Sequence, residues 1–175
     1  MKSITFKLVA VGVIFSASIT SIFAQITLDI SMPDDKKLLV NGSEINPKTN
    51  FANVKALFGE VSSEKEKGGG KEYMFESSGV IVSTNADGSV KGIGININWD
   101  GDKNFPKTAF SGTLAIGGTP VTAALKSEEL AKFKGVEFAC PFPLLCASKD
   151  NKAPVRSMIG FSSKNVLTQV IFIMQ

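Results

Sequence analysis

Residues 80–99 read VIVSTNADGSVKGIGININW, and this stretch decides the fold. A short apolar run comes first, the turn-forming residues NADG follow, and a second apolar run ends the stretch. In the second run Ile93, Ile95 and Ile97 alternate with small or polar residues. A period of two is typical of a strand with one buried face. The stretch therefore predicts two neighbouring strands joined by a short turn.

The opposite face of the second strand carries Gly92, Gly94, Asn96 and Asn98. This face is small, flat and uncharged, which suits the close approach of another chain or of a packed helix. Glycine within a strand often marks tight packing inside one fold. We therefore treat the four residues as a candidate contact face. The alternatives are that a helix beginning at Phe51 covers it, or that it faces water.

The same patterns predict further strands before and after this stretch. Asn41-Gly42 between short apolar runs indicates a two-residue hairpin turn. The C-terminal run 166–174 is apolar on both faces, which is typical of a central strand. The other predicted strands are ITLDISM (26–32), EYMF (72–75), the two arms of FSGTLAIGGTPVT (110–122), VEFAC (136–140) and VRSMIGF (155–161).

Two segments have the periodicity and end signals of short helices. Asn50 caps the first, and Gly59 ends it; Ser127 caps the second, and Gly135 ends that one. The segment 62–71, SSEKEKGGGK, reads as a solvated flexible loop. The connections are mostly short, so the sheet should be largely antiparallel. The predicted fold class is α+β, a largely antiparallel β-sheet with two short helices packed against it.

The N-terminus predicts export. Residues 1–24 combine a basic start, a short apolar centre and a small residue at position 24, which is the pattern of a secretory signal peptide. An uncleaved anchor is the alternative, although the apolar run is short and carries several hydroxyl residues. Cleavage leaves one predicted α+β domain, residues 25–175, in the periplasm or outside the cell. It also lowers the net charge from +3 to +1, which argues against nucleic-acid binding.

The two cysteines, Cys140 and Cys146, have five residues between them. Redox motifs of the thioredoxin type have two, and a structural zinc site needs four soft ligands in a chain that has no histidine. A nucleophilic thiolate would have only a lysine such as Lys149 to support it. A disulfide fits an oxidising compartment, provided that the segment bends back, and Pro141 and Pro143 favour such a bend.

Other motifs offer little chemistry. Asp100, Asp102 and Asn104 alternate as in a calcium loop, but the required glycine and glutamate are absent, so a turn is the simpler interpretation. Ser62 and Lys65 have the spacing of serine–lysine acyl-transfer enzymes without the supporting motifs. Carboxylate pairs for hydrolysis stay open, because their separation depends on the fold. The sequence predicts no cofactor, no metal and no enzymatic activity.

The run NFANVKALFGE, then KEYMF, then GVIVSTNADGSVKGIGININ resembles a helix–Leu-x-Gly–β-hairpin unit of exported bacterial α+β domains. It is similar to that unit in outer-membrane assembly lipoproteins and in β-lactamase inhibitory proteins. The chain lacks the lipidated cysteine of the former and the tandem duplication of the latter. The resemblance implies a non-catalytic module that binds another protein, and it assigns no individual residue.

Export, small size, missing catalytic groups and this resemblance together predict an inhibitor or immunity protein that blocks an envelope-acting toxin or hydrolase. Its expected partner is another protein, with no nucleic acid and no stable membrane insertion after signal cleavage. Two alternatives stay open. One is a structural or assembly component of the outer envelope, and the other is a hydrolase that uses carboxylates alone.

Overall fold

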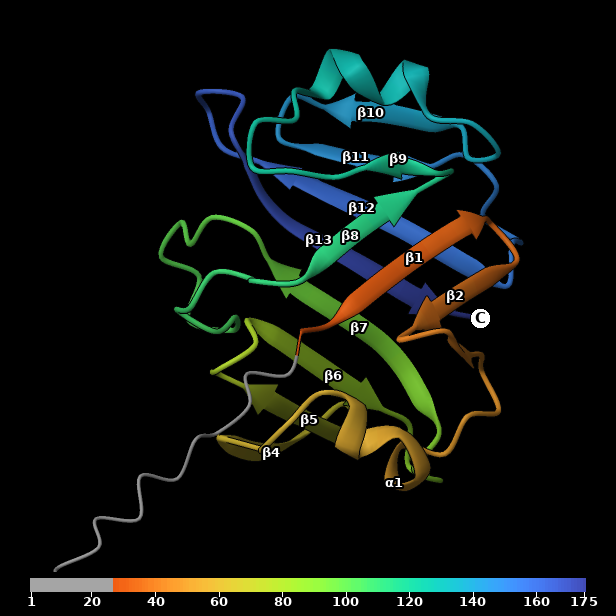
Figure 1. Cartoon of the computed structure of the whole chain (residues 1–175), viewed down its shortest axis with the longest axis vertical. Helices are drawn as coiled ribbons and strands as arrows, with labels where there is room; N and C mark the ends of the chain where they lie inside the picture. Colours follow the sequence, from red (N-terminus) through yellow and green to blue (C-terminus); the bar gives the residue numbers. More distant parts are fainter. Residues whose placement is uncertain (1–26) are drawn as a thin grey trace, which may run out of the picture.

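The computed structural model describes residues 27–175, which form two β-sheets packed face to face. In Figure 1 the small sheet lies in front of the large one. The small sheet has the order β3-β2-β1-β8-β9, with β1 (Asp29–Asp34), β2 (Lys37–Val40), β3 (Ser43–Ile45), β8 (Thr113–Ile116) and β9 (Thr119–Pro120). The large sheet has the order β10-β11-β12-β13-β7-β6-β5-β4, with β4 (Ser63–Lys67), β5 (Gly70–Phe75), β6 (Val80–Thr84), β7 (Val90–Asn96), β10 (Phe138–Phe142), β11 (Leu145–Ser148), β12 (Val155–Phe161) and β13 (Leu167–Met174).

The architecture is mostly antiparallel β-structure with few short helices, as the sequence predicts. The prediction of a single sheet covered by helices is wrong in one respect, because the second layer is another sheet. Strand β1 pairs in parallel with β8, from Asp29 opposite Thr113 to Met32 opposite Ile116. Short alternating strands bury one face each, and these faces are buried against the large sheet rather than against helices.

The core lies between the two sheets. Ile30 and Met32 from the small sheet, and Ile93 and Phe172 from the large sheet, are completely buried. The inner faces of both sheets belong to one hydrophobic cluster of the described residues. The predicted domain 25–175 therefore has, over its described part, one shared core.

The strands predicted from residues 80–99 are confirmed as β6 and β7, joined by the NADG turn. The hairpin turn at Asn41-Gly42 is also confirmed, with φ values of 49° and 76° at the two residues. Strand β13 is central, because β12 pairs with it on one side and β7 on the other.

Both predicted helices form, in shortened and partly 3₁₀ geometry. The first consists of α1 (Phe51–Val54) and the 3₁₀ turn η1 (Lys55–Leu57). The side-chain oxygen of Asn50 accepts a hydrogen bond from the backbone N–H of Ala52 at 2.9 Å, which confirms the predicted cap. The second is the 3₁₀ helix η2 (Ser127–Lys132), in which Ser127 is the first helical residue and not the cap.

The predicted loop at residues 62–71 is wrong. Its first half forms strand β4, and Gly68 and Gly69 make the turn into β5 with φ values of 61° and 81°. Alternating charges stabilise this hairpin across its two strands. The Lys71 ammonium lies 2.6 Å from a carboxylate oxygen of Glu64.

The predicted signal peptide, residues 1–24, lies outside the described residues. Between residue 27 and the C-terminus, no helix is long and apolar enough to cross a membrane.

Candidate functional site

The predicted contact face on β7 is buried by the chain itself. Gly92 and Gly94 are buried, Asn96 is completely buried, and Asn98 is half-buried. A Cβ atom added at Gly94 would lie 2.9 Å from Cε1 of Phe105, so the Phe105 ring lies directly over this glycine. This face is therefore not free for another chain.

The segment that covers it follows β7 and is held by side-chain hydrogen bonds. The amide nitrogen of Asn96 donates to the carbonyl oxygens of Pro106 at 2.9 Å and Thr108 at 3.0 Å. The amide of Asn98 donates to the carbonyl of Leu167 at 2.8 Å. The alternation identified the face correctly, but the cover is this loop rather than the helix at Phe51.

The candidate calcium ligands are used within the same loop. A carboxylate oxygen of Asp102 accepts from the backbone N–H and the side-chain amide of Asn104, both at 2.9 Å. The backbone N–H of Asn104 contributes most to holding the pKa of Asp102 below its ordinary value. Asp100 in turn accepts from the Asp102 backbone N–H at 3.1 Å. Over residues 27–175, no group of three or more His, Cys, Asp or Glu side chains could hold a metal ion.

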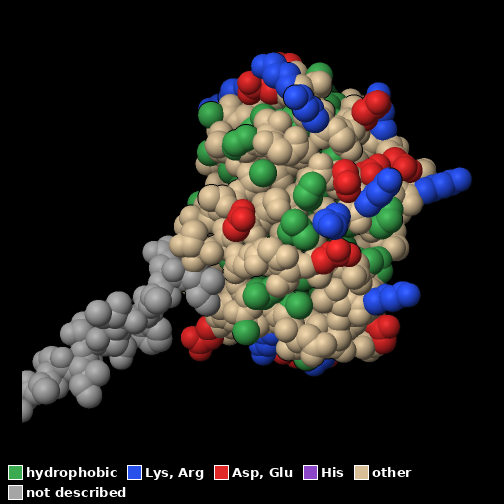
Figure 2. Space-filling view, turned by 45° about the vertical axis from the view of Figure 1, so that its right-hand side comes forward, with side chains coloured by type: hydrophobic (Ala, Val, Ile, Leu, Met, Phe, Trp, Pro, Cys, Tyr) green, Lys and Arg blue, Asp and Glu red, His purple; other side chains and the backbone are tan. Residues whose placement is uncertain are grey.

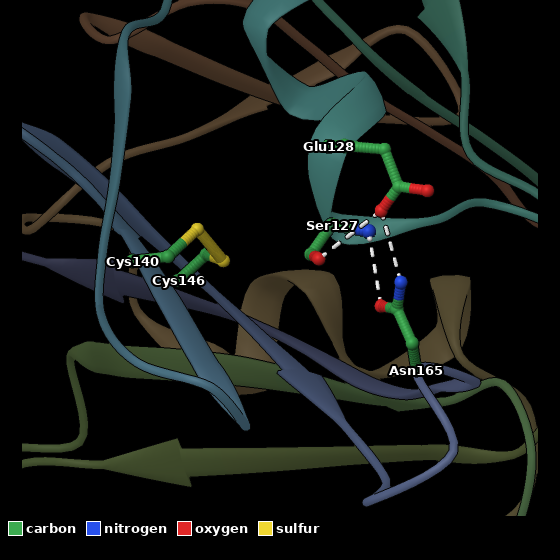
Figure 3. The surroundings of a disulfide bond; sticks show 5 residues. All are labelled: Ser127, Glu128, Cys140, Cys146 and Asn165. Atoms are coloured by element: carbon green, nitrogen blue, oxygen red, sulfur yellow. Dashed lines mark hydrogen bonds between the residues drawn. A yellow bond between two sulfur atoms is a disulfide. The ribbon is translucent and has the colours of Figure 1, made fainter.

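The predicted disulfide is confirmed. Cys140 in the middle of β10 is bonded to Cys146 on β11, with Cα atoms 4.0 Å apart (Figure 3). Cys146 is completely buried, whereas Cys140 is exposed. The bridge therefore fastens β10 to a strand that is fixed in the core.

The hairpin tip between the two cysteines is apolar and exposed. Its four residues are Pro141, Phe142, Pro143 and Leu144, and all four are exposed. Phe142 is 64% exposed and Leu144 is 49% exposed. These are two of the three large hydrophobic side chains that are exposed among the described residues, the third being Trp99. We call residues 141–144 the stapled tip.

The stapled tip is held in one conformation by several restraints. Phe142 pairs with Leu145 across the hairpin, and the carbonyl of Leu144 accepts from the backbone N–H of Phe161 on β12 at 2.9 Å. The two prolines fix their own φ angles. Because the backbone is already ordered, binding through this tip would lose little conformational entropy.

Neighbouring elements are locked together as well. The turn between β12 and β13 contains Asn165, whose side chain accepts from the N–H of Ser127 at 3.2 Å and donates to the carboxylate of Glu128 at 2.9 Å (Figure 3). Hydrogen bonds from its own backbone N–H and from Asn165 hold the pKa of Glu128 below its ordinary value. These bonds join η2 to the turn at the end of β12.

A polar cavity of about 400 Å³ lies where the β10–β11 hairpin meets the turn after β1. Glu137 and Lys149 form an ion pair there at 3.1 Å. Its lining residues are Asp35, Gly135, Val136, Glu137, Ser148, Lys149 and Asp150.

The sequence identified the disulfide but not the stapled tip as a site. The available signal was the composition of the ring, because PFPLL between the two cysteines is entirely apolar. A ring this short cannot fold its own side chains into a core, so the apolar residues at its apex remain at the surface.

A model of a domain family of unknown function, DUF7738, matches residues 28–131. The match includes the whole small sheet and strands β4–β7, and the four strands that follow, with the stapled tip, lie beyond it. Among curated proteins, no sequence matches the chain. The structure is similar to that of a cysteine-rich secretory protein from Staphylococcus aureus, with a TM-score of 0.45 and 12% identity over 85% of this chain. The chain spans 52% of that protein.

Proposed function

Because the chain belongs to this domain family of unknown function, we propose its role from the site itself. The protein is an exported, non-catalytic binding module, periplasmic or secreted. In its most concrete form it is an inhibitor or immunity protein that blocks an envelope-acting toxin or hydrolase. The observation that carries this proposal is the stapled tip, a fixed apolar protrusion with Phe142 at 64% exposure.

An exposed aromatic side chain on a rigid loop is the kind of residue that dominates protein–protein binding energy. Burying a Phe side chain in a partner's pocket is favourable by about 1.5–3 kcal/mol. In solution, exposing Phe142 and Leu144 side by side brings no benefit to the fold, because neither is packed into the core. Recognition by another protein accounts for this exposure.

Elsewhere the surface is mixed. Figure 2 shows basic and acidic side chains interspersed over one face, with hydrophobic side chains in small separate groups. Such a surface gives little long-range attraction to a highly charged ligand. Apolar contact at the stapled tip therefore supports the proposal better than electrostatic attraction does.

Site-specific photo-crosslinking tests the proposal. Benzoylphenylalanine replaces Phe142 in the full chain, expressed in the organism that makes the protein. The control carries the same group at Lys48, an exposed position after β3 on the small sheet. We expect one cross-linked protein from position 142 that is absent from position 48, and we expect the purified wild-type chain to inhibit that protein's activity.

The Phe142→Ala variant should then weaken inhibition about 30-fold or more, which corresponds to a binding hot spot, while its melting temperature stays that of the wild type. Inhibition that is unchanged in this variant would contradict the role of the tip. A hydrolytic activity of the chain itself that is lost in Asp35→Asn or Asp150→Asn would instead favour the carboxylate hydrolase.

A further inference from the structure

The outer face of strands β12 and β13 is apolar where a solvent-facing sheet is usually polar. Strand β12 along its whole length, and β13 from Thr168 onward, alternate between buried residues on the inner face and half-buried residues on the outer face. The outer positions include Met158 on β12 and Ile171 and Ile173 on β13. Met158 lies directly opposite Ile171 across the two strands. We call these three residues together with Arg156 the outer patch.

Arg156 is the single arginine of the sequence, and it lies in the outer patch opposite Ile173. Its Nε atom is buried and has no hydrogen-bond partner. Within residues 27–175 every ion pair is made by a lysine, and none involves Arg156. The Nε–H of the guanidinium group is thus a buried donor without an acceptor, and no carboxylate of the described residues forms an ion pair with this group.

A buried Nε–H donor of this kind costs free energy unless a group from another molecule accepts its hydrogen bond. A desolvated donor without an acceptor loses the free energy of its hydration. A carboxylate satisfies a guanidinium group best, because the two form parallel charge-assisted hydrogen bonds. Arginine is also enriched among the residues that dominate protein interfaces.

The outer patch is continuous with the stapled tip. Leu145, which directly follows the tip, lies opposite Gly160 on the same strand as Arg156. Positions 156 and 160 are four residue steps apart along the strand, or about 13 Å. A stable interface buries about 800 Å² on each partner, which is more than the tip alone provides. The outer patch supplies the neighbouring apolar surface, because it lies on strands next to those that hold the tip.

We infer that the outer patch is the second half of the interface, where Arg156 binds a carboxylate of the partner protein and the apolar residues around it pack against that partner. This inference rests on the proposed function. It defines the partner's chemistry as an apolar pocket for Phe142 and, next to that pocket, an Asp, Glu or C-terminal carboxylate bordered by apolar side chains.

The first experiment places benzoylphenylalanine at Met158, with Phe142 as the reference position and Lys48 as the control. We expect positions 158 and 142 to cross-link to the same protein, and mass spectrometry to locate the 158 cross-link within a few residues of an acidic side chain. A cross-link from 142 alone would overturn this inference and leave the proposed function intact. No cross-link from either position would overturn both.

The second experiment measures the Kd of the identified partner. Arg156→Gln should weaken binding at least ~10-fold, Arg156→Lys should recover only part of that loss, and Lys48→Gln, which removes an equivalent charge elsewhere, should have no effect. Equal affinities for wild type and Arg156→Gln would overturn the inference. Thermal melting of each variant separates loss of binding from loss of the fold.

Two alternative partners of the outer patch, a lipid surface and a second copy of the chain, are tested with the wild-type chain alone. Sedimentation with phosphatidylcholine–phosphatidylglycerol vesicles reports a lipid surface, and sedimentation equilibrium without partner reports a second copy of the chain. We expect neither association. Vesicle binding or dimer formation that Arg156→Gln abolishes would overturn the assignment to a different protein.

Discussion

The two edges of the large sheet differ in chemistry. Strand β4 at one edge is exposed along its whole length and consists of alternating Glu and Lys after Ser63. Strand β10 at the other edge ends in the apolar stapled tip and is closed by the disulfide. Free sheet edges can pair with other chains, so each edge needs some protection. Charge protects β4, whereas prolines and a covalent bridge protect β10.

The charge pattern of β4 prevents self-pairing. In an antiparallel pair of two copies related by a two-fold axis normal to the sheet, residues directly opposite each other lie on the same face. Glu64 of one copy would then lie opposite Glu64 or Glu66 of the other, and Lys65 opposite Lys65 or Lys67. Like charges directly opposite each other destabilise a sheet. The tip protects its edge differently, because Pro141 and Pro143 have no N–H to donate to an added strand.

This difference bears on where the proposed binding would take place. At β4 the side chains are already paired within the hairpin, since Glu72 lies 2.7 Å from Lys67 and 3.0 Å from Lys65. At the tip the backbone is constrained and the side chains of Phe142 and Leu144 have no such partners in the core. The proposed binding therefore belongs to the apolar edge, through side chains rather than through an added strand.

Removing the bridge should have the largest effect on stability. In the Cys140→Ser/Cys146→Ser variant we expect the free energy of unfolding to fall by about 2.4 kcal/mol, because the short ring no longer restricts the unfolded chain. Urea denaturation measures this change. Dithiothreitol should lower the stability of the wild type and leave the variant unchanged; an identical response of both proteins to the reductant would contradict the prediction.

Neutralising Glu72 should have a smaller effect at the opposite edge. Burial alone would raise the pKa of Glu72, but hydrogen bonds from Lys67 and Lys65 lower it below its ordinary value. The contribution of Glu72 to the stability of the fold is therefore present above about pH 4.5, the ordinary pKa of a Glu side chain. It is lost as the pH falls through the lower pKa that Glu72 has in the folded protein. Both lysines are about half exposed, so we expect Glu72→Gln to cost about 1 kcal/mol at neutral pH.

Denaturation at pH 7 and at pH 3 checks this prediction. The difference between wild type and Glu72→Gln should be present at neutral pH and should shrink in acid. Glu60→Gln, a change at an exposed carboxylate before β4, is the control and should match the wild type at both values. A difference that grows in acid would have the wrong sign for a lowered pKa.

Removing the charges of β4 should have the smallest effect in free energy, and it should change the oligomeric state of the chain. Replacing Glu64 and Glu66 by Thr, and Lys65 and Lys67 by Val, removes like-charge repulsion of about 0.2–1 kcal/mol for each pair in a self-paired edge. We expect this variant to self-associate in sedimentation velocity experiments. A Lys65→Arg/Lys67→Arg variant keeps the charges and should sediment like the wild type. If the quadruple variant also sediments like the wild type, a feature other than charge prevents pairing at this edge.

Periodicity predicted the strands well because burial on one face imposes it directly. Strand β7 shows the alternation in its sequence, whereas β6 and β13 contain the continuous apolar runs VIV and VIFIM. The β4 strand was missed because its alternation is between Glu and Lys, both polar, and a hydrophobic pattern cannot detect it. The second sheet was missed because pairing between β1 and β8 joins segments more than 80 residues apart, which no local pattern reports.

The site was predictable only in part. The disulfide follows from the compartment and the spacing of Cys140 and Cys146, and the structure confirms it. The β7 face was correctly recognised as a place of close approach, but whether Phe105 or another chain covers it depends on the path of a loop. The outer patch around Arg156 reads in sequence as part of an ordinary buried strand, because Met158, Ile171 and Ile173 make several outward positions of β12 and β13 apolar too.

The parallel pairing of β1 with β8 also determines the order in which the protein can fold. Asp29 and Thr113, whose side chains lie 2.6 Å apart, are 84 positions apart in the chain. Strands β4–β7 can form from local hairpins, whereas β1 has only β2 beside it and lacks its second neighbour until β8 is present. Contacts between such distant segments slow folding, because the chain must close a long loop before it gains them. The small sheet should therefore assemble last, and fragments that end before β8 should leave one edge of β1 unpaired and prone to aggregation.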